Sequence, residues 1–251
     1  MKFDLTKIEK SRFDFARKLR LPTNMDEYLA EDIGIMIGDG HIGKFVRPKR
    51  AVEYPIVCSC DAVTDKDYLV NFVRPLKQKL YYLEFAVSTT GKNRREMRIK
   101  INSKGLVNFY TKLIGLPLNK KTGIGIPEFI FKRKKWLKSC LRGIVDTDFC
   151  FRVKNNGYPS IKLKTESERL VRDCKKAFRI LGFETSTQTN VKEIHSTTKR
   201  AHTSNYLYLS GRAKLRKYIK KIGFRNIKNL KKIKKWAQRD SNPRPYNPVP
   251  T

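Results

Sequence analysis

The chain has 251 residues, 39% of them hydrophobic and 11% aromatic, which is enough to bury a core and excludes a disordered protein. Its 56 Lys and Arg against 23 Asp and Glu give a formal net charge of +33, a charge balance typical of proteins that bind nucleic acid. No apolar run approaches the roughly 18 residues that a membrane span needs, and the N-terminus lacks the apolar core of a signal peptide, so we expect neither membrane association nor secretion.

One order of predicted elements occurs twice, after an N-terminal extension at 1–23. The first repeat, 24–122, is predicted to contain a helix at 24–38, strands at 41–47 and 54–60, a helix at 65–80, strands at 83–90 and 95–102, and a helix at 104–115. The second repeat, 123–238, is predicted to contain a helix from Pro127 to 148, strands at 149–155 and 160–165, a helix at 167–181, strands at 184–190 and 205–211, and a helix at 212–223. The predicted fold class is α+β, with two pseudo-symmetric αββαββα repeats.

Several of these strands alternate apolar side chains with basic or aromatic ones, so each sheet would have an apolar back and a basic front. An amphipathic sheet with a solvated lysine face would show the same alternation, but its repetition and the net charge favour a surface that binds a duplex. The candidate DNA-binding residues on these fronts are Lys44, Arg98, Lys100, Arg152, Lys154, Lys162, Lys164, Tyr206 and Tyr208.

The last part of the chain is first basic and then proline-rich. From Ile194 to Arg239 it contains 15 Lys and Arg and no Asp or Glu, although pairs of opposite charge normally support surface helices. We therefore expect the second repeat to end in a basic helix that lies near phosphates. The tail at 239–251 is predicted to be disordered. Its Asp-Ser-Asn-Pro run can be encoded by a sequence that resembles the T-arm of a tRNA gene, which suggests such a gene as a host.

Two similar stretches, "DIGIMIGDG" at 32–40 and "LRGIVDTDF" at 141–149, end the first helix of each repeat. Small residues four positions apart lie on one face of a helix, and two such faces let helix backbones approach closely. We therefore expect the small residues to form a helix interface that brings the two acids after them together. The matching positions are, in pairs, Gly34 and Gly143, Gly38 and Thr147, and Asp39 and Asp148.

The two acids are candidate ligands of a divalent metal. An acid at the C-terminal end of a helix faces the negative end of the helix dipole, and two such acids close together also repel each other. A divalent cation removes both penalties, so Asp39 and Asp148 form a candidate Mg²⁺ site. On a basic surface, such a site suits phosphodiester cleavage. Taken singly, Asp39-Gly40 is more typical of a turn and Asp148 of a solvated helix end; the pairing of the motifs favours the metal site.

The two stretches and their surroundings resemble the LAGLIDADG homing endonuclease family. The stretch "IPEFIFKRKKWLKSCLRGIVDTD" is similar to that family's second motif with its lead-in, and "IGIMIGDGHI" is similar to a variant of its first motif. The resemblance implies a monomer in which the motif helices form the interface between the two halves. It further implies that the two antiparallel sheets form a saddle over double-stranded DNA.

The resemblance also implies roles for particular residues. Asp39 and Asp148 would bind the catalytic divalent ions, Mg²⁺ or Mn²⁺ in its place, in a metal site that includes Gly38 and Thr147. Basic residues assist in this family. For that role the segment at the junction of the repeats offers Lys120 or Lys121, of which we select Lys121, and the end of the second repeat offers Lys228.

The second motif departs from the family pattern at two positions. Its sixth position is Asp146, where the first motif has Ile37, and Asp146 would pair with a nearby lysine. Its ninth position is Phe149, where the first motif has Gly40. A glycine there would let the backbone turn sharply, so the geometry of the second site is left open by the sequence.

The function that we expect is that of an intron-encoded, free-standing endonuclease that cuts double-stranded DNA and leaves short 3′ overhangs. It would act in the cytoplasm or nucleoid, or in an organelle. One alternative is an RNA maturase, which binds its intron RNA and assists splicing. A second alternative is a DNA-binding regulator that retains the fold without catalysis, although neither motif acid is lost here.

Overall fold

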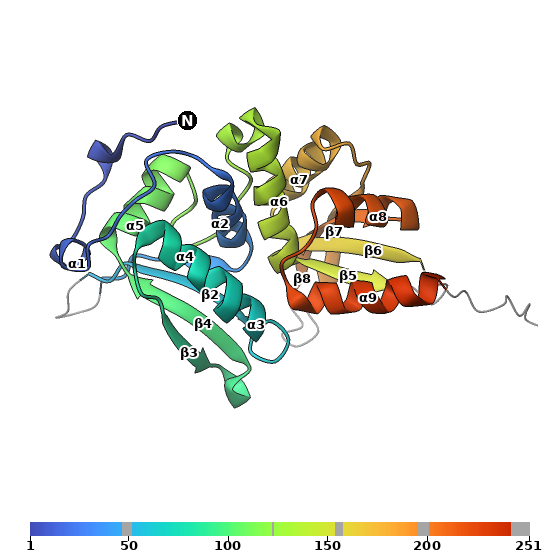
Figure 1. The fold of residues 1–251 in the computed structure, drawn as a ribbon, viewed down its shortest axis with the longest axis horizontal. Helices are drawn as coiled ribbons and strands as arrows, with labels where there is room; N and C mark the ends of the chain where they lie inside the picture. The colour runs from blue at the N-terminus through green and yellow to red at the C-terminus, as the bar shows by residue number, and fades with distance from the viewer. Residues whose placement is uncertain (47–51, 122, 154–157, 195–200, 242–251) are drawn as a thin grey trace, which may run out of the picture.

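Two four-stranded antiparallel sheets with the same strand order form the two halves of the molecule (Figure 1). The computed structural model describes residues 1–46, 52–121, 123–153, 158–194 and 201–241. The strand order is β1-β2-β4-β3 in the first sheet and β5-β6-β8-β7 in the second. This repetition confirms the predicted α+β fold of two αββαββα repeats. In the described part of the chain, no helix is long and apolar enough to cross a membrane.

The first repeat follows an N-terminal extension that contains a 3-10 turn, η1 (Leu5–Lys7), and helix α1 (Arg12–Ala16). Asp14 of α1 is fully buried and accepts hydrogen bonds from Ser103 Oγ (2.6 Å) and Gly105 N (3.0 Å), so the extension packs onto this repeat. The elements of the repeat are α2 (Glu27–Gly38), β1 (Gly40–Ile42), β2 (Pro55–Asp61), α3 (Lys66–Tyr68), the π-helical η2 (Leu69–Val73), α4 (Arg74–Tyr81), β3 (Ala86–Thr90), the 3-10 turn η3 (Lys92–Arg94), β4 (Glu96–Asn102), α5 (Lys104–Asn108) and the π-helical η4 (Phe109–Ile114).

The second repeat begins with a 3-10 turn and ends with a helix that has no counterpart in the first. Trp236 of this last helix, α9, packs its ring 6.3 Å from that of Phe151 in β5 and so holds α9 against the edge strand of the sheet. The elements are η5 (Glu128–Lys132), α6 (Lys134–Asp148), β5 (Phe149–Val153), β6 (Pro159–Thr165), α7 (Glu168–Ile180), β7 (Ser186–Ile194), β8 (Ala201–Ser210), α8 (Arg212–Lys221) and α9 (Ile227–Ser241).

Several predicted boundaries differ from the structure. The strand expected at 41–47 is β1 at Gly40–Ile42, and the strand expected at 83–90 is β3 at Ala86–Thr90. The helix expected from Pro127 begins at Lys134, because Arg133 has an extended backbone (φ −137°, ψ 127°) and separates α6 from the 3-10 turn before it. Strands β7 and β8 are longer than expected, since cross-strand pairing continues as far as Ile194 and Ala201. The end of the strand predicted at 149–155, which includes Lys154, and the predicted tail from 242 onward lie outside the described residues.

Helices α2 and α6 lie side by side at the centre of the molecule, with one sheet on each side (Figure 1). Their backbones touch at the two paired glycines. A Cβ atom added to Gly34 would collide with the backbone carbonyl of Cys140, and one added to Gly143 would collide with that of Glu31. Because these obstacles are backbone atoms, no change of rotamer can remove them. The two small residues therefore set how closely the halves of the protein approach.

Charged side chains are buried on both sides of this helix pair. Asp32 of α2 is fully buried and accepts hydrogen bonds from Lys77 Nζ (2.6 Å), Tyr81 Oη (2.6 Å) and Tyr110 Oη (2.5 Å). The ion pair with Asp32 raises the pKa of Lys77 against the opposing effect of its burial. Between the repeats, Arg142 of α6 binds both carboxylate oxygens of Glu31. These pairs offset the cost of burying charges, and they fix α2 against α4 and α6.

The close contact of α2 and α6 predicts that one methyl group added at Gly34 lowers stability. Gly34→Ala should lower the free energy of unfolding by about 2–3 kcal/mol, because the helices must separate to admit the Cβ atom. Urea denaturation followed by circular dichroism measures this loss. Lys134→Ala at the exposed start of α6 is the control and should change stability little. An unchanged midpoint for Gly34→Ala would contradict the backbone contact.

The buried ion pair generates a second prediction. Lys77→Met leaves the Asp32 carboxylate buried without its counter-charge and should cost about 3–5 kcal/mol of unfolding free energy. The double variant Asp32→Asn with Lys77→Met removes both charges and should recover part of that loss. The loss of unfolding free energy in the double variant is compared with the sum of the losses in Lys77→Met and Asp32→Asn. If the double variant loses more than that sum, the pair does not interact as the structure implies.

Candidate active site

Asp39 and Asp148 lie at adjoining ends of the two central helices. Asp39 caps α2 with φ −86° and ψ −1°, and its amide donates to the carbonyl of Ile35 (3.0 Å), while Asp148 is the last residue of α6. A Cβ atom added to Gly38 would strike the side chain of Thr147 and lie 3.3 Å from Cγ of Asp148. The small residues that let the helices touch thus also bring the two acids to one place.

Both carboxyl groups are perturbed by their surroundings. Burial, and after it the negative charge of Asp148, together raise the pKa of Asp39 to about 7. Burial raises the pKa of Asp148 to about 6, against the opposing charge of Lys121. Two acids in this state favour a bound cation, since a cation stabilises the ionised form that burial and mutual repulsion disfavour.

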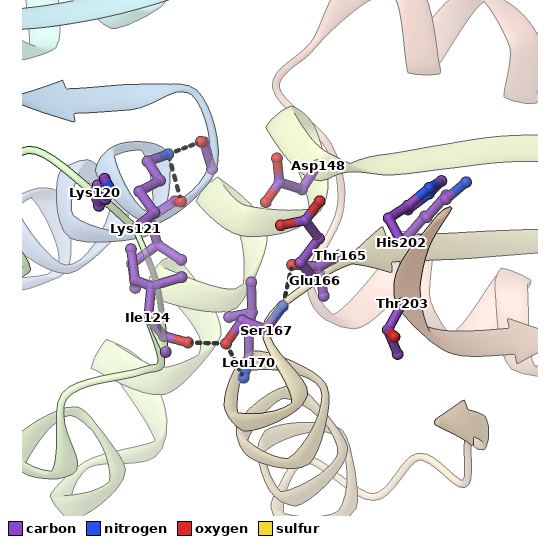
Figure 2. Close-up of a pocket in the computed structure, with 14 residues that line it drawn as sticks. Lys120, Lys121, Ile124, Asp148, Thr165, Glu166, Ser167, Leu170, His202 and Thr203 are labelled. Atoms are coloured by element: carbon purple, nitrogen blue, oxygen red, sulfur yellow. Dashed lines mark hydrogen bonds between the residues drawn. The ribbon is translucent and has the colours of Figure 1, made fainter. Parts of the chain in front are cut away.

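Lys121, from the segment that joins the repeats, brings a positive charge to this pair. Its ammonium donates a hydrogen bond of 2.8 Å to the carbonyl of Ile37 and another to that of Gly38 (Figure 2). Burial lowers the pKa of Lys121, and the charges of Asp148 and Asp39 oppose that shift. The ammonium therefore lies at the C-terminal end of α2, where the helix dipole favours a cation.

Lys228 of α9 is held by a third acid. Its Nζ donates to Asp65 Oδ2 at 2.7 Å, and Asn226 Nδ2 donates to Asp65 Oδ1 at 2.6 Å. Strand β2 joins this ion pair to Asp39, because the amide of Ser59 donates to the Asp39 carbonyl (3.2 Å) and the amide of Asp65 donates to the carbonyl of Asp61 (3.0 Å). The charges of Asp65 and Lys228 accordingly act on the pKa of Asp39. Motif reasoning alone did not identify Asp65, because it lies at the start of a helix far from both motifs in sequence.

Asp146 does not pair with a lysine as expected. Its carboxylate accepts hydrogen bonds from the backbone amide of Arg225 (2.7 Å) and from Asn229 Nδ2 (3.4 Å), and it is almost fully buried. Burial raises its pKa to about 7 against the opposing effect of these hydrogen bonds. The acid at the sixth motif position therefore anchors the start of α9 rather than binding a side-chain cation.

Phe149 at the ninth motif position causes no backbone strain. Its backbone is extended (φ −93°, ψ 144°), and its ring is buried 6.1 Å from that of Phe178. In the first motif, Gly40 is required by a close approach, because an added Cβ atom would lie 2.5 Å from Cα of Met36. The mismatch therefore changes local packing and does not require a different turn at the second site.

A hollow of about 710 Å³ opens beside the acids on the side of the second repeat (Figure 2). Lys121 and Asp148 both line it, and Glu166 and His202 line its other parts. Among the described residues, no three His, Cys, Asp or Glu side chains converge as a metal-binding group. A metal held by Asp39 and Asp148 would thus take its other ligands from backbone carbonyls, water and a phosphate. This donor set fits Mg²⁺, which keeps several waters and prefers oxygen.

Most candidate DNA-binding residues lie on the front faces of the sheets. In β4, Arg98 and Lys100 alternate with buried residues, and Arg98 donates to Ser88 Oγ of β3 (3.2 Å). In the second sheet, Lys162 pairs with Tyr208 across β6 and β8, and Lys164 pairs with Tyr206. Lys44, Arg152 and Lys164 are exposed.

Tyr206 departs from the expected exposed position. It is only 4% exposed, because Lys162 Nζ lies 4.0 Å above its ring and its hydroxyl donates to Glu193. Glu193 also pairs with Lys164 at 2.6 Å, and these contacts lower its pKa to about 2. Glu193 is the one acid in β7 and lies just before the stretch without acids, so its isolation in the sequence is the signal that marks it. It orders the lysines of this front, and Tyr206 supports them rather than being free to contact DNA.

Comparison with known proteins shows what the chain is similar to in sequence and fold. Residues 135–223 match the family described as LAGLIDADG-like domain. A 115-residue segment is 30% identical to part of an A-type ATP synthase protein from Pyrococcus abyssi (strain GE5 / Orsay). That segment is 46% of this chain and 9% of the ATP synthase protein, so the chain matches under a tenth of that relative's length.

Solved structures extend the similarity to most of the chain. The homing endonuclease I-DmoI, in a structure of mesophilic variants, aligns with 78% of this chain and 95% of its own, at 14% identity and a TM-score of 0.56. The LAGLIDADG meganuclease I-AabMI, bound to uncleaved DNA, aligns with 86% of this chain and 91% of its own, at 14% identity and a TM-score of 0.51. The chain thus has the fold of the LAGLIDADG homing endonucleases, and its second repeat carries a LAGLIDADG-like domain.

Proposed function

We propose that this protein is a site-specific endonuclease that hydrolyses phosphodiester bonds of double-stranded DNA with a divalent metal. The observation that carries the proposal is the pair Asp39 and Asp148, held together between two basic sheets by backbone contact of their helices. Structures of I-DmoI were solved with DNA and Mn and with DNA and Ca, which supports a divalent metal beside DNA in this fold.

The residues at the site have separable tasks in this proposal. Asp39 and Asp148 would hold the metal, Mg²⁺ or Mn²⁺ in its place, which when bound supplies charge stabilisation for the attacking and leaving oxygens. Gly38 and Thr147, which touch where the two helices end, would belong to the same metal site. Lys121 and Lys228 would neutralise phosphate charge and orient water at the two sides of Asp39. The basic fronts of the sheets would hold the duplex over the acids.

Further features belong to the same proposal. The protein would act as a monomer, since its two repeats already supply both acids. It would leave short 3′ overhangs, be encoded by an intron and act in the cytoplasm, nucleoid or an organelle. A maturase that binds intron RNA is the main alternative; tight binding of that RNA by a protein that cuts no DNA would favour it.

The acids predict the central experiment. With Mg²⁺ and intronless-allele DNA, Asp39→Asn or Asp148→Asn should lower the cleavage rate at least about 100-fold, because each change removes a metal ligand. Binding of the same DNA, measured by fluorescence anisotropy, should be retained. Asp61→Asn on the first sheet is a matched control, and its cleavage rate should stay near wild type.

Metal removal completes this test. Excess chelator should abolish cleavage by the wild-type protein, and added Mg²⁺ should restore it. If both acid variants cleave DNA at the wild-type rate, Asp39 and Asp148 are not the metal ligands.

The sheet fronts predict how binding depends on salt. Arg152→Ala should weaken DNA binding and reduce the slope of log K against log salt by about 0.9, the value for one lost phosphate contact on duplex DNA. Lys100→Ala on the first sheet should act in the same way. The control is Lys175→Ala, an exposed residue of α7 on the helical side, which should leave the slope unchanged. If all three variants have the same slope of log K against log salt, the duplex binds a surface other than the sheet fronts.

A further inference from the structure

Asp65 is a buried acid that the proposed function leaves without a task. It lies directly before α3 in the first repeat and is 8% exposed. Its carboxylate accepts hydrogen bonds from Thr64 Oγ1 (2.6 Å), Asn226 Nδ2 (2.6 Å) and Lys228 Nζ (2.7 Å). The last two donors are the residue before α9 and a residue of its first turn, so Asp65 joins the first repeat to the end of the second.

The pseudo-symmetry supplies a natural comparison for this contact. The residue before α7 in the second repeat is Ser167, whose hydroxyl donates to the carbonyl of Ile124 (2.6 Å). Ile124 belongs to the segment that follows the first repeat. Each repeat thus uses the residue before this helix to hold the segment that leaves the other repeat. The first repeat does so with a charged group and the second with a neutral hydroxyl.

The two lysines beside the acids are therefore held by different means. Lys121 is held by the main-chain carbonyls of Ile37 and Gly38, which are present whatever side chains those residues carry. Lys228 is held by the side chain of Asp65, at 2.6 Å from one carboxylate oxygen and 2.7 Å from the other. Only the second lysine can be released by changing one side chain.

The surroundings of Asp65 keep this ion pair in one arrangement. Asn226 is 1% exposed and donates both to Asp65 and to the carbonyl of Asp146 (3.1 Å). The backbone amide of Arg225 and the side-chain amide of Asn229 (3.4 Å) both donate to Asp146, so the first turn of α9 is fixed on both sides of Lys228. A long, flexible side chain attached to a fixed backbone needs only one further anchor to be positioned, and Asp65 supplies it.

We infer that Asp65 is a positioning residue that holds the Lys228 ammonium beside Asp39 and so supports cleavage of one of the two DNA strands. The inference rests on the proposed endonuclease function. It follows that the two strands depend on different anchors: one strand requires the Asp65 carboxylate, and the other is served by Lys121 on its main-chain carbonyls.

The test measures the cleavage of each strand separately. A DNA target that carries a different fluorophore on each strand is cut by the full-length protein with Mg²⁺ under single-turnover conditions. Asp65→Asn retains an oxygen that accepts from Asn226 and removes the charge that holds Lys228. We expect it to slow one strand about tenfold or more, because a misplacement of about 1 Å can cost about 100-fold, while the other strand stays within about twofold.

Three further variants separate positioning from general structure. Lys228→Met should slow the same strand, and Asp65→Asn combined with Lys228→Met should slow it no more than Lys228→Met alone. Asp65→Glu restores the charge and should restore part of the strand's rate. Ser167→Ala at the pseudo-symmetric position is the control and should not change the ratio of the two strand rates.

The outcomes separate this inference from the proposed function. If the wild-type protein cuts neither strand, the proposed function fails and this inference fails with it. If the wild type cuts both strands and Asp65→Asn slows both equally, or slows neither, only the inference is overturned. A lower urea midpoint with equal loss on both strands would assign Asp65 to stability alone.

Discussion

Backbone contact between α2 and α6 is the constraint on which the rest of the molecule depends. It exists because Gly34 and Gly143 have no side chain between the two helices. The same contact brings Asp39 and Asp148 together, sets the spacing of the two sheets and buries the pair of Glu31 with Arg142. A glycine inside a helix costs about 1 kcal/mol relative to alanine, and here that cost is offset by the packing of two whole repeats.

Charge is distributed unevenly over this frame. The protein has a formal net charge of +33, yet its centre concentrates acids whose pKa values burial raises. Lysines reach that centre from segments that follow the repeats rather than from the motifs themselves. On the front of the second sheet, Glu193 holds Lys164 and covers Tyr206, so an acid organises a basic face. The balance suits a polyanion at the surface and a cation at the centre.

The two halves share a fold, but matching motif positions pack differently in each half. Gly40 is required by a close approach to Met36, whereas Phe149 at the same motif position fills a space beside Phe178. Asp146 replaces an apolar residue because the second half must also hold α9, which has no counterpart in the first repeat. The departure at Asp146 thus falls where the second repeat holds an additional helix, and the departure at Phe149 falls where it packs against α7.

The sequence by itself determined the repeat, the order of its helices and strands and the pairing of the motif acids, because these depend on local periodicity and on spacing along the chain. The resemblance of the motifs to the homing endonuclease family also indicated Lys121, one of two adjacent lysines at the junction of the repeats. Only the tertiary structure decided what Asp146 binds, that Tyr206 is covered, and that Asp65 holds Lys228, residues 163 positions apart in the chain. Contacts of this kind join segments that share no local pattern, and they form only when the two repeats pack together.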